Sequence, residues 1–180
     1  AWFRKNGVNI KVISGDNAQT VSVIAQKAGV PDADKFVSAE NMTDAELVEA
    51  ARDTAVFGRV SPEQKAVLIR AIKQQGKTVA MTGDGVNDIL AMKQADCAVA
   101  MASGSEAARS VAHLVLLDSC FSSMPNVVRE GRQVVNNIQN STSLFLMKTI
   151  MTIFTTLLTL VLGRDYPLEP QHLYVMEFFV

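Results

Sequence analysis

The sequence predicts an α/β fold, a doubly wound parallel sheet, followed by a transmembrane α-helix. Three observations support this expectation. Short apolar runs rich in β-branched residues alternate with helical segments between residues 9 and 117, and this alternation is typical of parallel sheets covered by helices. Polar, glycine-containing turns follow two of these runs, at residues 14–16 and 83–88. About nineteen largely apolar residues then run from 144 to 162, a length sufficient to cross a bilayer.

The elements follow in a regular order along the chain. The first helix is expected to end at Gly29, and Pro62 and Gly76 delimit the third helix. Thr43 and Glu46 have the spacing of a capping box, which marks the start of the second helix. Strands are expected at residues 9–13, 56–58, 78–81, 97–101 and 113–117. Helices are expected at residues 17–28, 43–52, 62–75, 87–95 and 105–112, and residues 32–41 are expected to form a polar connection.

The charge and the cysteine content indicate which partners and which cellular compartment are expected. The net charge of −1 and the pI of about 6.2 give no basic footprint for nucleic acid. Cys97 and Cys120 lie far apart without a Cys-x-x-Cys or a histidine cluster. We therefore expect two reduced thiols in a cytosolic domain.

The most informative stretch is residues 80–88, Ala-Met-Thr-Gly-Asp-Gly-Val-Asn-Asp. Two glycines bracket Asp84, so the backbone can turn sharply and approach a ligand closely. Asn87 and Asp88 follow where a helix would begin. Carboxylates on such a loop are oxygen ligands that Mg²⁺ accepts alongside phosphate. The alternative is an ordinary turn whose Asn or Asp only caps a helix.

Two further residues are suited to holding a phosphoryl group. Ser14, at a strand end beside Gly15, can donate its hydroxyl and a backbone N–H to a phosphoryl oxygen. Lys65, in the first turns of a helix, supplies a positive charge. Asp88 would support a magnesium site indirectly or through water, and Asn87 could donate to the phosphate. Taken singly, Ser14 could be a turn residue and Lys65 a solvated helix charge; their combination with Asp84 favours a phosphate site.

These strings, taken together, resemble the P-type ATPases, ion pumps built on a haloacid dehalogenase-like phosphorylation domain. Residues 80–88 resemble the hinge motif of the pumps, and Val-Ile-Ser-Gly-Asp-Asn at 12–17 resembles their strand-end segment, with Ser14 where the pumps usually carry Thr. Gly-Arg-Val-Ser-Pro-Glu-Gln-Lys at 58–65 is similar to their lysine-bearing segment. Residues 100–105 and 130–132 also match, so the resemblance covers essentially all 180 residues.

The resemblance implies an ATP-driven cation pump that forms an aspartyl-phosphate intermediate, with Mg²⁺ as cofactor and ATP as substrate. It implies metal binding by Asp84 and Asp88. The expected catalytic residues are Ser14, Gly15, Asp16, Lys65, Asn87 and Asp88. The residues expected to bind the cofactor and nucleotide are Ser14, Gly15, Asp16, Arg59 and Lys65.

The nucleophile of such a reaction is missing from this sequence. In the pumps an Asp-Lys-Thr-Gly-Thr motif carries the nucleophilic aspartate, and no such string occurs here. We therefore expect a fragment that cannot hydrolyse ATP by itself. Its parts would be a partial phosphorylation domain (1–122), a cytosolic stalk helix (123–143), a transmembrane helix (144–162), an extracytoplasmic loop (163–172) and the start of a second transmembrane helix (173–180).

The apolar stretch at 144–162 could alternatively be a buried helix of a soluble protein, but its length and its mainly threonine polar residues favour a membrane span. Arg129 and Arg132 on the near side predict that the preceding residues are cytoplasmic, in a protein of the cell membrane. Lys148 and Glu177 are candidates for contacting the transported ion, because charges within a span are costly. The expected partners are an inorganic cation, membrane lipid and the rest of the pump.

Two other classes of protein stay open from the sequence. A soluble haloacid dehalogenase-like phosphatase would share Ser14, Lys65, Asp84 and Asp88 but would not partition into a membrane. A non-catalytic regulatory remnant of a pump would lack the nucleophile and have no coding sequence for the other half.

Overall fold

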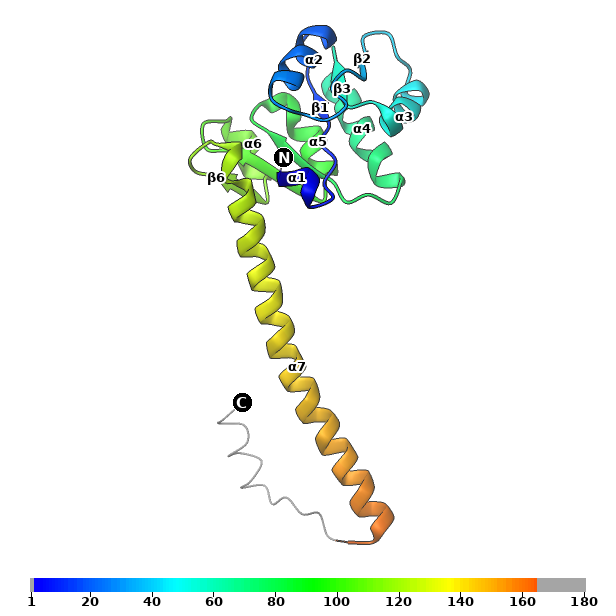
Figure 1. Cartoon of the computed structure of the whole chain (residues 1–180), viewed down its shortest axis with the longest axis vertical. Helices are drawn as coiled ribbons and strands as arrows, with labels where there is room; N and C mark the ends of the chain where they lie inside the picture. Colours follow the sequence, from blue (N-terminus) through cyan, green and yellow to red (C-terminus); the bar gives the residue numbers. More distant parts are fainter. Residues whose placement is uncertain (1, 165–180) are drawn as a thin grey trace. The chain divides into compact units, whose positions relative to one another are not determined.

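The computed structural model describes residues 2–164 and divides the chain into two compact units, Ala1–Pro125 and Asn126–Val180. The first unit holds the strands and the short helices, and the second is described by one long helix (Figure 1).

The described strands of the first unit form two parallel sheets (Figure 1). One has the order β1 (Val12–Ile13), β3 (Val56–Gly58), β2 (Phe36–Ser38), and the other has the order β4 (Ala80–Gly83), β5 (Cys97–Met101), β6 (Leu114–Leu116). Every pair is parallel. The predicted parallel α/β class is confirmed, although the strands pair as two sheets with β1 and β4 each at an edge.

Local capping explains where the helices begin. Asn17 accepts hydrogen bonds from the backbone of Gln19 and Thr20, and Thr43 forms the expected capping box with Glu46. Ser61 forms a second capping box, with Gln64. The helices and 3₁₀ turns of the first unit are α1 (Trp2–Lys5), α2 (Ala18–Lys27), α3 (Asp44–Asp53), α4 (Pro62–Gln74), η1 (Val86–Asp88), α5 (Ile89–Gln94), α6 (Glu106–Val111) and η2 (Phe121–Ser123).

The main differences from the expected elements concern three strands. The short edge strand β2 lies within the segment expected to be a polar connection, and the first strand is confined to Val12–Ile13. The strand expected from residue 78 begins at Ala80. The N–H of Val79 donates to the Asp96 carboxylate at 2.8 Å, so this N–H is not paired with a neighbouring strand. The hydrogen bond from the Lys73 side chain, and to a smaller extent that from the Val79 N–H, hold the pKa of Asp96 below its ordinary value.

The core of the first unit is built from the inner faces of the strands and helices. Phe57 of β3 and Leu68 of α4 are fully buried in one cluster, and Met92 of α5 is fully buried in another. Ile13 of β1 packs against both clusters. The two sheets therefore meet around the end of β1, the strand that carries Ser14.

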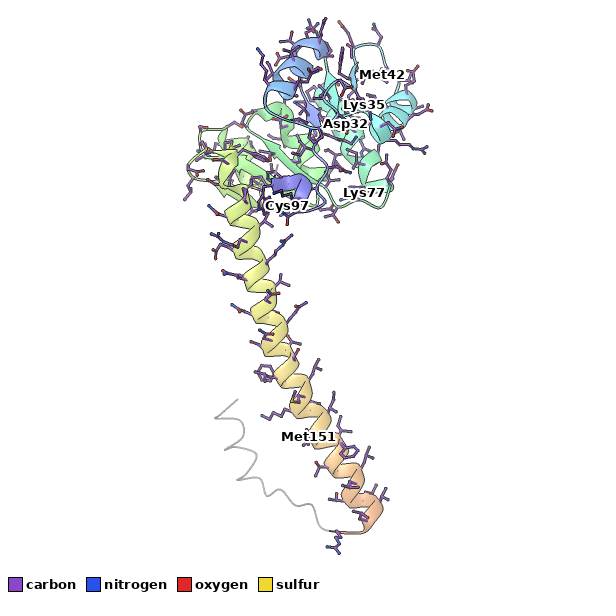
Figure 2. All side chains as sticks on the ribbon, viewed as in Figure 1. Asp32, Lys35, Met42, Lys77, Cys97 and Met151 are labelled. Atoms are coloured by element: carbon purple, nitrogen blue, oxygen red, sulfur yellow. The ribbon has the colours of Figure 1, made fainter. Side chains whose placement is uncertain are left out.

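The second unit is described by α7 (Met124–Leu162), which continues the polar segment into the apolar one without a break. Its apolar side chains project outward (Figure 2), and Met151 is 58% exposed. Among the described residues, this is the one helix long and apolar enough to cross a membrane. Its threonines donate to carbonyls of the preceding turn, as Thr155 does to Met151 at 2.8 Å. These bonds satisfy hydroxyls that would otherwise be costly in hydrocarbon. Glu177 lies outside the described residues.

Candidate active site

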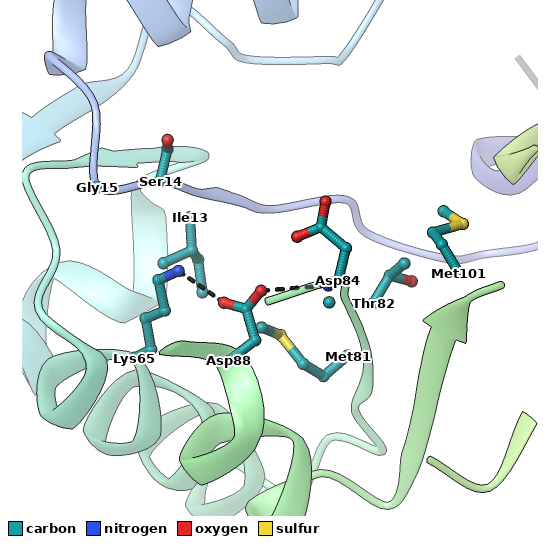
Figure 3. A pocket seen from close by; sticks show the side chains of 10 residues that line it. Ile13, Ser14, Gly15, Lys65, Met81, Thr82, Asp84, Asp88 and Met101 are labelled. Carbon is teal, nitrogen blue, oxygen red and sulfur yellow. Dashed lines mark hydrogen bonds and ion pairs between the residues drawn. The ribbon is translucent and has the colours of Figure 1, made fainter. Parts of the chain in front are cut away.

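A pocket of about 360 Å³ lies at the carboxyl ends of β1 and β4 (Figure 3). Parallel strands present their loops at this edge, and ligands of doubly wound folds bind there. The lining residues come from β1 and its loop, α4, β4 and its loop, η1, and the end of β5: Ile13, Ser14, Gly15, Lys65, Met81, Thr82, Gly83, Asp84, Asp88 and Met101. The fold thus brings Ser14, Lys65, Asp84 and Asp88 together, as the sequence predicted.

Lys65 and Asp88 form an ion pair at the base of this pocket. Lys65 Nζ donates to Asp88 Oδ1 at 2.7 Å, and each side chain is only 12% exposed. Ser61 and Pro62 set the start of α4, which places Lys65 in its first turns. Pairing offsets much of the cost of removing both charges from water. The pair therefore fixes the position of the lysine ammonium in the pocket lining.

The second oxygen of Asp88 organises the loop after β4. Asp88 Oδ2 accepts the backbone N–H of Asp84 at 3.3 Å and that of Gly85 at 3.4 Å. Gly83 is needed for this close approach, since a Cβ there would lie 2.6 Å from Asp88 Cβ. Both carboxylate oxygens of Asp88 are thus engaged within the protein. This arrangement suits a supporting role for Asp88 better than direct contact with a metal ion.

Asp84 is placed differently from Asp88. Its side chain is exposed, and Figure 3 shows its carboxylate directed away from Asp88 into the open side of the pocket. Among residues 2–164 no group of three or more His, Cys, Asp or Glu side chains is arranged to hold a metal ion. Mg²⁺ commonly takes one or two protein carboxylates and completes its shell with water and phosphate oxygens. The exposed Asp84 carboxylate fits that mode of binding.

The loop after β1 offers hydrogen-bond donors to the same pocket. Ser14 is partly buried, and its hydroxyl donates to Asp16 Oδ2 at 3.0 Å while accepting the Asp16 backbone N–H at 3.2 Å. Its backbone is held on β3 through the Ser14 N–H to Phe57 carbonyl bond of 2.9 Å. The hydroxyl is thus held by an exposed side chain and can exchange that partner for a phosphate oxygen.

Three of the residues predicted for the phosphate and nucleotide site do not line the pocket. Asp16, Arg59 and Asn87 are all exposed, Asp16 and Arg59 in loops and Asn87 in η1. Arg59 has a positive φ of 52°, and its N–H donates to the Asp16 carbonyl at 2.8 Å. The two loops that carry Asp16 and Arg59 are therefore tied together through the backbone.

Several pocket residues were not selected from the sequence. Thr82 lies within the most informative stretch, two residues before Asp84, so a period-two reading of the strand end could have identified it. Ile13, Met81 and Met101 supply the apolar part of the lining, and their sequence pattern is that of ordinary core residues.

Comparison with known proteins gives concordant results. A family model described as haloacid dehalogenase-like hydrolase matches residues 1–96. A probable cation-transporting ATPase of Streptococcus pneumoniae is 46% identical over 99% of this chain and 24% of its own length. The calcium-transporting ATPase CtpE of Mycolicibacterium smegmatis is 40% identical over the same shares. A crystal structure of a zinc-transporting PIB-type ATPase in an E2·Pi state superimposes with a TM-score of 0.62 at 26% identity, over 86% of this chain and 21% of that one. The chain thus spans about a quarter of the length of these curated relatives.

Proposed function

The chain belongs to the haloacid dehalogenase-like hydrolase family, and we propose that it forms part of an ATP-driven cation pump that passes through an aspartyl phosphate. The observation that carries this proposal is the convergence of Ser14, Lys65, Asp84 and Asp88 on one pocket at the strand ends. The names of the relatives agree with this interpretation.

Each pocket residue has a part in handling a phosphoryl group. The Ser14 hydroxyl and the Gly15 backbone donate to phosphoryl oxygens, and the Lys65 ammonium offsets their negative charge. Asp88 keeps that ammonium in place through the 2.7 Å ion pair. Asn87 of η1 would donate to the phosphate, and Asp16 and Arg59, in the neighbouring loops, would contact the nucleotide.

Asp84 would hold Mg²⁺, with Asp88 supporting it through the loop backbone. When bound, the ion neutralises negative charge on the phosphoryl group. The exposed carboxylate of Asp84 and the satisfied oxygens of Asp88 support this division between the two acids.

The nucleophilic aspartate would come from a strand outside this sequence. β1 and β4 are both sheet edges, and the carboxyl ends of both line the pocket. Edge strands have unpaired backbone groups that can accept a further strand. A strand inserted between β1 and β4 would join the two sheets and bring an aspartate at its end to the pocket.

The test of the site is Asp84→Asn in the full-length pump. Phosphoenzyme formed from labelled ATP with Mg²⁺ should fall sharply, because a neutral amide oxygen binds Mg²⁺ much more weakly than a carboxylate does. Asp34→Asn, which alters an exposed carboxylate outside the pocket, is the control and should label normally. Normal labelling of Asp84→Asn would contradict the metal-binding role.

For α7 we propose a membrane span that carries motion from the cytoplasmic domain toward an ion site, in the cell membrane. The cargo is an inorganic cation, and Lys148 and Glu177 are the candidate residues: the Glu177 carboxylate would bind the cation or pair with the Lys148 ammonium. The exposed apolar side chains of α7 support this, since Leu160 is 78% exposed and Val161 81% exposed without a surrounding bilayer.

The span can be tested by alkaline extraction of membranes from cells that express the 180-residue chain. The chain should stay in the membrane pellet. Leu157→Asp combined with Leu158→Asp should release it, because each charge within a span adds up to about 3 kcal/mol to the cost of insertion. Leu157→Ile combined with Leu158→Ile is the matched control. Release of the unaltered chain would favour a soluble phosphatase.

A further inference from the structure

The loop between β5 and α6, residues 102–105, contacts the backbone of Asp84. The backbone N–H of Ser105 donates to the Asp84 carbonyl at 2.7 Å. Gly104 lies directly against the same residue: a Cβ built there would be 2.8 Å from the Asp84 carbonyl oxygen and 3.1 Å from Asp84 Cα. Only a residue without a side chain permits this approach.

The backbone of Asp84 is consequently held at both of its polar groups. Its N–H donates to Asp88 Oδ2 at 3.3 Å, and its carbonyl accepts from Ser105 at 2.7 Å. Its side chain is exposed to the pocket. A backbone held at two points, with an exposed carboxylate, presents that carboxylate in a restricted range of positions.

The loop at 102–105, which contacts Asp84, is itself held by several hydrogen bonds. Ala102 donates its N–H to the Leu116 carbonyl at 3.0 Å and accepts Arg109 Nη1 at 2.6 Å. The Ser103 N–H donates to Ser119 Oγ at 2.9 Å, and the Ser105 hydroxyl accepts the Ala108 N–H at 3.1 Å. A loop tied to β6, α6 and the segment after β6 cannot withdraw easily from Asp84.

We propose that Gly104 and the backbone N–H of Ser105 are positioning residues, which hold Asp84 where it can bind Mg²⁺. This inference rests on the proposed function, because it assigns the positioning of the same metal-binding carboxylate. Groups that orient a metal ligand typically alter metal affinity or activity about 10–100-fold when they are lost.

The hydrogen bond from Ser105 can be tested with a matched pair of substitutions in the full-length pump. Ser105 has a φ of −62°, which suits proline. Ser105→Pro therefore removes the N–H and the capping hydroxyl together, whereas Ser105→Ala removes the hydroxyl alone. We expect Ser105→Pro to raise the Mg²⁺ concentration for half-maximal phosphoenzyme at least about tenfold, and Ser105→Ala to leave it close to the parent value.

The contact of Gly104 is tested in the same assay. Gly104→Ala should also raise the half-maximal Mg²⁺ concentration, because the added methyl group displaces the Asp84 backbone. Ser103→Ala is the control on the same loop, since the Ser103 side chain is exposed and its anchoring bond uses the backbone N–H. ATP affinity, measured on the same preparations, should stay unchanged in all four variants. A general loss of folding would lower the amount of active protein without moving the Mg²⁺ dependence.

The outcomes separate this inference from the proposed function. Unchanged Mg²⁺ dependence in Ser105→Pro and Gly104→Ala, with Asp84→Asn inactive, would overturn the positioning role alone. Normal phosphoenzyme in Asp84→Asn would overturn both, because Asp84 would then have no metal-binding role to support. A shift in Ser105→Pro and Gly104→Ala, absent from Ser105→Ala and Ser103→Ala, supports the inference.

Discussion

The loops after β1 and β4 meet at the same pocket, yet they are built in different ways. In the loop after β1, the Ser14 hydroxyl bonds an exposed side chain two residues away in the same loop. In the loop after β4, Asp88 is 8% exposed and bonds Lys65 of α4 as well as two backbone N–H groups. The first loop is held mainly through its backbone, and the second through a buried charged side chain.

Under the proposed function, this difference separates the groups that would contact a ligand from those that hold the loop in place. Ser14 and Asp84 keep polar atoms accessible to the pocket, whereas Asp88 has its oxygens occupied. A buried ion pair costs desolvation and is sensitive to loss of either partner. Substitution of Asp88 should therefore affect stability more than substitution of Ser14, and substitution of Ser14 should affect mainly activity.

The largest effect on stability is expected for Asp88→Asn. This substitution leaves the Lys65 ammonium at the base of the pocket without its charged partner, which should lower the free energy of unfolding by about 3 kcal/mol. Urea unfolding of the 180-residue chain in detergent micelles would measure it.

A double-mutant cycle sharpens this prediction. If the cost arises from the unpaired charge, Lys65→Met combined with Asp88→Asn should be less destabilising than the sum of the two single substitutions. If the losses of unfolding free energy in the two single variants add up to the loss in the double variant, the ion pair does not hold the loop after β4.

The smallest effect on stability is expected for Ser14→Ala. The loss of unfolding free energy should stay within about 0.5 kcal/mol, as for other substitutions at partly exposed positions. The Ser14 N–H still donates to the Phe57 carbonyl, and the Ser14 carbonyl still accepts the Val60 N–H. Phosphoenzyme formation in the full-length pump should nevertheless fall, and Ser14→Thr should restore it, since threonine keeps the hydroxyl. Full activity of Ser14→Ala would restrict the role of this loop to its backbone.

Most helices could be predicted because their signals are local in the sequence. The capping box of Thr43 with Glu46 involves residues three positions apart, and so does that of Ser61 with Gln64. The edge strand β2 could not be predicted, because it is three residues long and two of these are exposed, which leaves too short an alternation to recognise. The start of β4 depended on Asp96, which lies 17 residues away from Val79.

By itself, the sequence determined the parallel α/β class, the four residues that converge on the pocket and the apolar stretch that follows. These follow from periodicity, from turn chemistry, from the rule that parallel strands present their loops at one edge, and from the resemblance of the surrounding motifs to the P-type ATPases. Only the tertiary structure decided which of those residues are paired within the protein and which are exposed to the pocket. Contacts between distant segments determine three features: the ion pair of Lys65 with Asp88, the exposure of Asp84 and the close contact of Gly104 with the Asp84 backbone. Such contacts are set by how whole elements pack, and no local pattern of residues encodes them.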